Sequence, residues 1–102
     1  MILYSVAVTI PSEIAEEWLR WMLDLHIPDV MKTGMFTRFK IFKNRAFDVS
    51  GETEFCTQYE AESFKNYELY RTEFAPELQR HHTEKFGTVA KARRMVLEEI
   101  IQ

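Results

Sequence analysis

Three side chains of this sequence have the chemistry needed to move a proton or orient a polar substrate: His26, Tyr59 and His82. Histidine titrates near neutral pH, and a tyrosine hydroxyl both donates and accepts hydrogen bonds. We predict these three as the catalytic side chains of any active site, with His26 as a general base or as a donor to an anionic substrate. The alternative for His26 is a structural one, in which it caps a free carbonyl of the last helical turn.

The position of each histidine supports this hypothesis in a different way. His26 is predicted near the negative C-terminal end of a helix, which would raise its affinity for a proton. His82 shares a helical face with Leu78 and Phe86 and should point inward. Its alternative is a satisfied core residue, whereas His81 should be solvated.

Four aromatic side chains recur at helical spacing and could form the wall of a ligand pocket: Trp18, Trp21, Tyr67 and Tyr70. The alternative is that all four simply pack in the core. We predict no metal site, because the only neighbouring histidines, 81 and 82, diverge by roughly 100° on a helix, and no spacing requires His26 and His82 to meet a carboxylate. We also predict no cofactor, since the sequence has no Gly-rich phosphate loop. Cys56 is the only cysteine, so no internal disulfide is possible, and a reducing cytoplasmic location is expected.

The length and the charge of the chain limit the class of protein. The 102 residues fit a single domain over 1–102. A net charge of -3, with lysines and arginines spread along the chain, argues against nucleic-acid binding. No stretch approaches the roughly 20 apolar residues of a membrane span, so no membrane association is expected.

The elements that position these residues follow from hydrophobic periodicity and from turn residues. Strands are predicted over 2–10, 36–43, 53–60 and 88–98. One helix is predicted to begin with Ser12 as its N-cap and to weaken at 26–27, because Pro28 disfavours helical backbone in the residue before it. A second helix is predicted to begin with Ser63 as its N-cap and to be broken at Ala75-Pro76. The order predicts an α+β, ferredoxin-like β-α-β-β-α-β fold, with one four-stranded antiparallel sheet and proline-broken helices on one face.

One face of that sheet would remain uncovered. By strand alternation we expect it to carry a mixture of polar and apolar side chains: Ser5, Ala7, Thr9, Arg38, Lys40, Cys56, Gln58, Ala90, Ala92 and Arg94, with Phe36, Phe42 and Val96 among them. Two such faces packed together would cover it, so we predict a homodimer through the open sheet face. The alternative is a monomer with a solvated sheet.

Several motifs together resemble the DUF4286 family, a domain of unknown function, over nearly the whole chain. They are WLRWMLDLHIPDVMKTGMF at 18–36, QYEAES at 58–63, YELY at 67–70 and EFAPELQRHHTEKFG at 73–87. The family is in turn similar to the dimeric α/β-barrel superfamily, and the His-x-Pro at 26–28 resembles its EthD-like branch. The resemblance implies face-to-face dimers with a small pocket between sheet and helices.

Members of that superfamily include cofactor-independent monooxygenases, lactone isomerases, haem-handling enzymes and small sensor proteins, so the resemblance leaves the activity open. Three hypotheses follow. The protein is a homodimer that binds a small molecule, a cofactor-independent monooxygenase- or isomerase-type enzyme with His26 as base, or a structural interaction domain without a pocket. A cavity that touches two of His26, Tyr59 and His82 would favour the first two.

Overall fold

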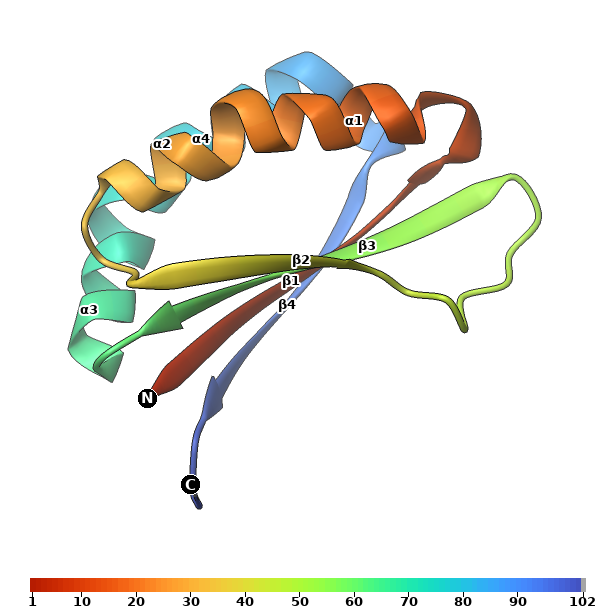
Figure 1. Cartoon of the computed structure of the whole chain (residues 1–102). Helices are drawn as coiled ribbons and strands as arrows, with labels where there is room; N and C mark the ends of the chain where they lie inside the picture. The colour runs from red at the N-terminus through yellow and green to blue at the C-terminus, as the bar shows by residue number, and fades with distance from the viewer. Residues whose placement is uncertain (102) are drawn as a thin grey trace.

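The computed structural model describes residues 1–101 and contains one antiparallel sheet covered by helices on one face (Figure 1). The strands are β1 (Ile2–Pro11), β2 (Arg38–Lys43), β3 (Glu52–Ala61) and β4 (Lys91–Glu98), in the spatial order β2-β3-β1-β4. Each neighbouring pair is antiparallel. The predicted ferredoxin-like α+β fold is confirmed.

Two long helical stretches lie across the sheet, and each consists of two α-helices joined by a π-helical turn. The first comprises a 3-10 turn, η1 (Ser12–Ile14), α1 (Ala15–Trp21), η2 (Met22–His26) and α2 (Ile27–Lys32). The second comprises α3 (Phe64–Leu69), η3 (Tyr70–Phe74), α4 (Ala75–Phe86) and a short 3-10 turn, η4 (Gly87–Val89). The π-helical turns η2 and η3 each end two residues before a proline.

The interruptions predicted at the prolines are therefore π-helical turns, and neither helix ends there. A proline has no N–H, so the carbonyl four residues before it lacks its usual donor. The turn preceding each proline widens, and Ile27 N–H donates to the Met22 carbonyl as Ala75 N–H does to the Tyr70 carbonyl. Ile27 keeps helical backbone angles (φ -62°, ψ -45°) although a proline follows it.

The widened turn also resets which residues face the sheet. Buried positions step by five and then three in both helices, from Met22 to Ile27 to Val30 and from Tyr70 to Ala75 to Leu78. A regular α-helix advances in steps of three and four. The five-residue step keeps the inward face of the helix continuous across the π-helical turn. It also brings the last residue of that turn, His26 in the first helix, alongside the core.

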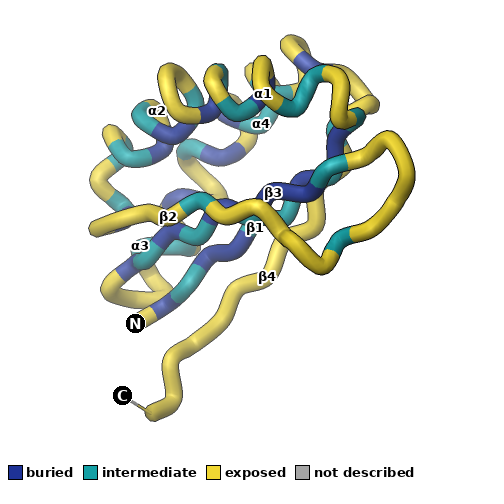
Figure 2. The backbone as a smooth tube through the Cα atoms, turned by 45° about the vertical axis from the view of Figure 1, so that its right-hand side comes forward, coloured by how far each residue is buried: buried dark blue, intermediate teal, exposed yellow. Residues whose placement is uncertain are grey.

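Strand register decides which side chains face the helices. The even residues of β1 face them, as predicted, and Tyr4 pairs with Tyr59 while Val6 pairs with Arg94. The last strand was predicted with the wrong alternation: Ala92, Arg94 and Val96 face the helices, and Ala90 packs against the core. β4 is an edge strand exposed along its whole length (Figure 2), so its hydrophobicity gives little indication of its orientation.

Phe36 is a second correction to the predicted open face. It precedes β2 and is buried against Tyr4, Tyr59 and Tyr70, with ring centroids 4.8–5.9 Å apart. Strand alternation does not apply to it, because the β2 ladder begins only at Arg38. The core thus lies wholly between the helices and the covered face of the sheet.

Candidate functional site

Two adjoining cavities lie between the π-helical turns and the covered face of the sheet. Their volumes are about 50 and 40 Å³. The outer one is lined by Val6, Val8, Met22, His26, Gln79, His82, Ala92 and Arg94. The inner one shares six of these side chains and adds Tyr4, Thr57, Tyr59 and Tyr70. His26 therefore meets His82 in one cavity and Tyr59 in the other.

His26 is the last residue of the π-helical turn η2 and is half-buried. Its ring stacks on Trp21, with centroids 5.4 Å apart, and meets the edge of His82 at 6.0 Å. Burial lowers the pKa of His26 to about 4, and His82 adds to this effect. The helix continues beyond His26, so the predicted helix-end position, with its capping role and raised proton affinity, is wrong.

His82 points inward from α4, as predicted, and its hydrogen bond fixes its tautomer. Trp18 Nε1–H donates to His82 Nε2 over 2.9 Å. An indole can only donate, so this ring nitrogen must carry a lone pair, and the proton of the neutral ring is on Nδ1. Burial lowers the pKa of His82, and the charge of Arg94 lowers it further. Both histidines are therefore neutral at neutral pH.

Arg94 is the one formally charged side chain that lines either cavity. Its Nε–H donates to the buried hydroxyl of Tyr4 over 3.2 Å. Within residues 1–101 it forms no ion pair with a carboxylate. The sequence analysis missed Arg94 because it placed β4 with the wrong face inward. The sequence analysis grouped Arg94 correctly with Ala90 and Ala92, but the types of these residues do not show which side of the sheet they face.

The remaining predicted aromatic residues fall into two groups. Tyr59 and Tyr70 line the inner cavity, and burial raises the pKa of both phenols. Trp18, Trp21 and Tyr67 line neither cavity. Trp18 stacks on Phe55, Trp21 packs against Phe86, and Tyr67 packs against Tyr4, so these three hold the lining residues in place.

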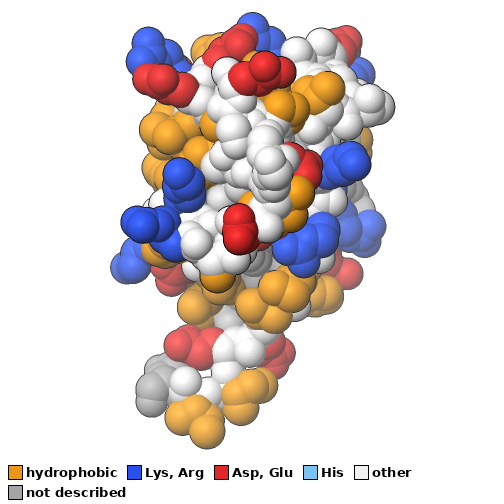
Figure 3. All heavy atoms as spheres, turned by 90° about the vertical axis from the view of Figure 1, so that its right-hand side faces the viewer, with side chains coloured by type: hydrophobic (Ala, Val, Ile, Leu, Met, Phe, Trp, Pro, Cys, Tyr) orange, Lys and Arg blue, Asp and Glu red, His pale blue; other side chains and the backbone are white. Residues whose placement is uncertain are grey.

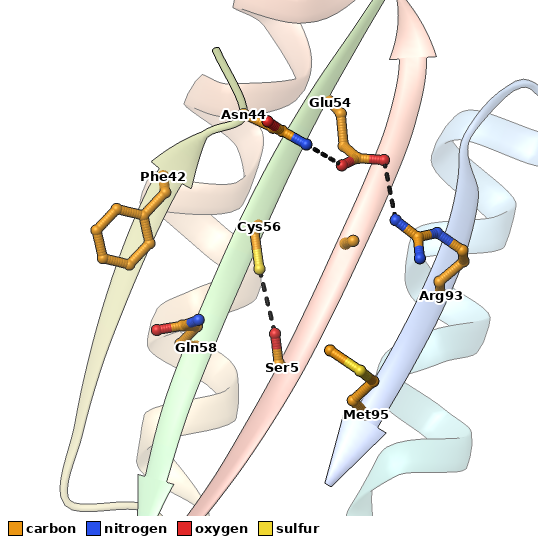
Figure 4. Close-up of a pocket in the computed structure, with 9 residues that line it drawn as sticks. Ser5, Phe42, Asn44, Glu54, Cys56, Gln58, Arg93 and Met95 are labelled. Carbon is orange, nitrogen blue, oxygen red and sulfur yellow. Dashed lines mark hydrogen bonds and ion pairs between the residues drawn. The ribbon is translucent and has the colours of Figure 1, made fainter. Parts of the chain in front are cut away.

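A larger groove of about 300 Å³ lies on the open face of the sheet (Figure 4). The small side chains of Ser5 and Cys56 form its floor between Phe42 on β2 and Met95 on β4. Ala7 also lines the groove. Ser5 Oγ and Cys56 Sγ are 3.2 Å apart.

At one end of this groove lies Glu54, whose side chain is only 6% exposed. Its carboxylate accepts hydrogen bonds from Asn44 (2.8 Å), Thr9 (3.1 Å) and Arg93 (3.3 Å). The Asn44 hydrogen bond is the main cause that lowers the pKa of Glu54. Every carboxylate oxygen therefore has a protein partner, and this cluster is complete without a ligand.

No three His, Cys, Asp or Glu side chains within residues 1–101 are placed to hold a metal ion together. In the same part of the chain, no helix has the length and apolar character to cross a membrane.

Comparison with known proteins identifies the family. The family model of DUF4286, described as a domain of unknown function, matches residues 1–100. This chain belongs to the DUF4286 family. The predicted resemblance is thereby confirmed. No curated protein matches the chain in sequence.

Solved structures similar to this DUF4286 chain share its fold at low sequence identity. A dimeric ferredoxin-like protein from an uncultured marine organism aligns over 100% of both chains, with a TM-score of 0.66 and 19% identity. An EthD family protein from Bacillus halodurans C-125 aligns over 98% of this chain and 100% of its own, with a TM-score of 0.66 and 16% identity. The heme degrader MhuD from Mycobacterium tuberculosis, solved with two hemes in its active site, aligns over 100% and 98%, with a TM-score of 0.65 and 18% identity. These likenesses establish the fold.

Proposed function

We propose that this DUF4286 protein is a homodimer whose subunits each bind a small organic molecule beneath the π-helical turns. The observation that carries the proposal is the convergence of His26, His82, Gln79 and Arg94 on one cavity from three different elements. A purely structural domain would be expected to have a solid core at this point. We also propose that residues 1–102 act as one domain and that the protein is cytoplasmic, in keeping with the unpaired thiol of Cys56.

The size of the cavities indicates how a ligand would enter. At about 50 and 40 Å³ they hold a few water molecules, whereas ligand pockets commonly reach about 300–1,000 Å³. Met22 and Gln79 have flexible, unbranched side chains, and Ala92 and Arg94 lie on the exposed edge strand. Rotation of the Met22 and Gln79 side chains would enlarge the cavity without moving the backbone.

Dimerisation would use the open face of the sheet. Phe42 and Met95 are 47% and 55% exposed there, on either side of a groove with a small-residue floor. The chain beyond β4 also projects from the body (Figure 3), and its Ile100 and Ile101 are 80% and 86% exposed. A second copy packed on this face would remove that apolar surface from water, and a solved protein of the same fold is described as dimeric.

Two substitutions would test the two sites separately. Ala92→Leu fills the cavity beneath the helices, and Ala7→Leu fills the groove on the opposite face. Thermal-shift screening of small molecules should give ligands that stabilise the wild type and the Ala7 variant but not the Ala92 variant. Ligands that stabilise the Ala92 variant as strongly would bind elsewhere, and an absence of ligands would contradict the proposal.

The dimer is tested by sedimentation of Met95→Glu beside a matched control, Leu23→Glu. Both residues are exposed, but Leu23 is on the helices, away from the open sheet face. We expect the wild type and the Leu23 variant to be dimers and the Met95 variant to be monomeric. A monomeric wild type would exclude the proposed interface.

A second candidate is a cofactor-independent isomerase- or monooxygenase-type enzyme, favoured by one observation: a neutral His26 shares a cavity with the positively charged Arg94. His26 would accept a proton from a carbon next to a carbonyl, and Arg94 would stabilise the enolate that results. His26→Gln should then retain binding of the screened ligands and lose their turnover, whereas His81→Gln should retain both. Unchanged turnover in the His26 variant would exclude this mechanism.

Haem does not fit this site. Cavities of about 50 and 40 Å³ leave no room for a porphyrin, and the Nε2 atom of His82 is already engaged by Trp18. His26 stacks on Trp21 and meets the edge of His82, so a macrocycle would have to displace this cluster. The proposed function therefore involves no haem.

A further inference from the structure

The electrostatic character of the cavity beneath the π-helical turns restricts its ligand. Among the twelve side chains that line the two compartments, none is a carboxylate and one, Arg94, is a permanent cation. Elsewhere within residues 1–101, Arg38, Arg80 and Arg93 pair with glutamates, whereas the exposed Arg20, Arg45 and Arg71 form no ion pair and line neither compartment. Arg94 thus carries a positive charge beside a cavity that offers no negative group.

Arg94 is also held in place at the cavity. Tyr4, which is only 4% exposed, accepts the hydrogen bond from Arg94 Nε. The Tyr4 ring is itself fixed between Phe36, Tyr59, Tyr67 and Tyr70, at centroid distances of 5.2–6.0 Å. A guanidinium has five N–H donors, and this hydrogen bond uses one of them. Other N–H groups of Arg94 are therefore available to an acceptor.

The neighbouring polar groups favour an acceptor as well. His82 uses its lone pair to accept from Trp18, so its remaining ring nitrogen is a donor. His26 is neutral and can supply either a donor or a lone pair. The amide of Gln79 has N–H donors as well as a carbonyl acceptor, and the remaining outer lining is apolar: Val6, Val8, Met22 and Ala92.

We infer that the ligand of this site is a small organic anion, a carboxylate or enolate with a short apolar part, and that Arg94 is the residue that selects its charge. This inference rests on the proposed small-molecule site and specifies the class of ligand. A charge-assisted hydrogen bond from guanidinium to an anionic oxygen is stronger than a bond between neutral groups. A neutral molecule of the same shape would make only the weaker hydrogen bond to the Arg94 guanidinium, without the attraction between opposite charges.

Acetate and acetamide are suitable probes because they have nearly the same shape and differ in charge. Each is titrated into the full-length protein at constant ionic strength, while NMR follows the ring signals of His26 and His82. We expect saturable, millimolar binding of acetate, and binding of acetamide weaker by about tenfold or more. Equal affinities, or no saturable shift with acetate, would overturn the inference.

Neighbouring residues of β4 provide the matched variants. Arg94→Gln should weaken the binding of acetate by about tenfold or more and abolish the preference for acetate over acetamide. Arg94→Lys keeps a positive charge and should retain the preference, and Arg93→Gln, on the opposite face of the sheet, should bind like the wild type. Wild-type affinity in Arg94→Gln, or an equal loss in Arg93→Gln, would overturn the inference.

The same titration separates this inference from the proposed function. Acetate could leave the ring signals of His26 and His82 unchanged while neutral molecules from the thermal-shift screen shift them. In that case the small-molecule site exists and the inferred negative charge of its ligand is wrong. If molecules of neither charge shift them, the proposed function is wrong too.

Discussion

The two faces of the sheet place successive arginines of one strand in opposite environments. Arg93 points to the open face and pairs with the buried carboxylate of Glu54, whose other hydrogen bonds also come from the protein. Arg94 points to the covered face, bonds the hydroxyl of Tyr4 and has no carboxylate partner within residues 1–101. The first arginine completes a structural cluster, and the second leaves a charge available beside a cavity.

This difference separates stability from binding. A buried polar group that is fully hydrogen-bonded contributes to the folded state, and losing one partner is costly. A charged side chain that lines a cavity and has no oppositely charged partner in the protein is instead a candidate for ligand recognition. The comparison therefore predicts large stability effects where hydrogen bonds are complete and small ones at Arg94.

The largest effect is expected in the core beneath the covered face. Trp18 is fully buried, and Trp18→Ala should lower the free energy of unfolding by about 3–5 kcal/mol. Trp18→Phe keeps a ring but leaves His82 without its donor, and should cost about 1–2 kcal/mol. Urea denaturation measures both.

On the open face, Phe42→Ala should cost about 1 kcal/mol or less in the isolated chain, and a larger loss there would contradict the comparison.

The next effect is the pH dependence caused by His26. Its pKa is about 4 in the folded protein, against 6.5 for a solvent-exposed histidine, so the unfolded chain binds the proton more tightly. Stability should therefore be full above pH 6.5 and fall by about 3 kcal/mol as the pH drops through 4. His82 and Arg94 oppose protonation of His26, as does His81, whereas Asp29 favours it.

His26→Gln should remove most of this acid sensitivity, leaving a smaller part from His82, whose pKa is lowered as well. The exposed His81→Gln is the control and should keep the wild-type profile. Thermal denaturation between pH 4 and pH 8 measures the pH dependence of stability in each variant. An unchanged profile in the His26 variant would show that His26 is not buried as described.

A smaller effect is expected on the open face at Glu54. Glu54→Gln keeps the shape but loses the charge that Arg93 and Asn44 bind, and should cost about 1–2 kcal/mol in urea denaturation. Glu60→Gln provides the control, because its partner Arg38 is largely exposed and such pairs contribute about 1 kcal/mol or less. Equal losses would mean that the Glu54 cluster adds no more than a surface ion pair.

The smallest effect sharpens the comparison between the two arginines. Arg94→Gln should change the free energy of unfolding by about 0.5 kcal/mol or less, because the strand is exposed and the glutamine amide, bonded to Cδ as the arginine Nε is, can still donate to the Tyr4 hydroxyl. Arg93→Gln removes a partner from a buried carboxylate and should cost about 1 kcal/mol. If the Arg94 variant were the less stable of the two, Arg94 would be a structural residue.

The sequence predicted the fold well and the site only in part, for physical reasons that differ by element. Alternation in β1 is decisive because its even side chains are bulky and buried, and Ser63 does cap α3 by accepting from Asn66 N–H. Edge strand β4 lacks such a pattern, so the orientation of Arg94 was missed. Ser12 forms no cap and instead bonds Thr53 across to β3.

The π-helical turns could not be predicted from α-helical periodicity alone. Each proline indicated an interruption, but the five-residue step from Met22 to Ile27 was needed to recognise a widened turn. The hydrogen bond between Trp18 and His82 joins residues 64 positions apart, and no local pattern indicates it.

The most direct test of the separation between the two faces uses methionine methyl signals in one labelled sample. Met22 lines the cavity beneath the helices, and Met95 lines the groove on the open face. Acetate, or a ligand from the thermal-shift screen, should shift the Met22 signal and leave Met95 unchanged, whereas dilution to monomers should do the reverse. A ligand that shifts Met95 alone, or dilution that shifts Met22 alone, would contradict the assignment of binding to one face and dimerisation to the other.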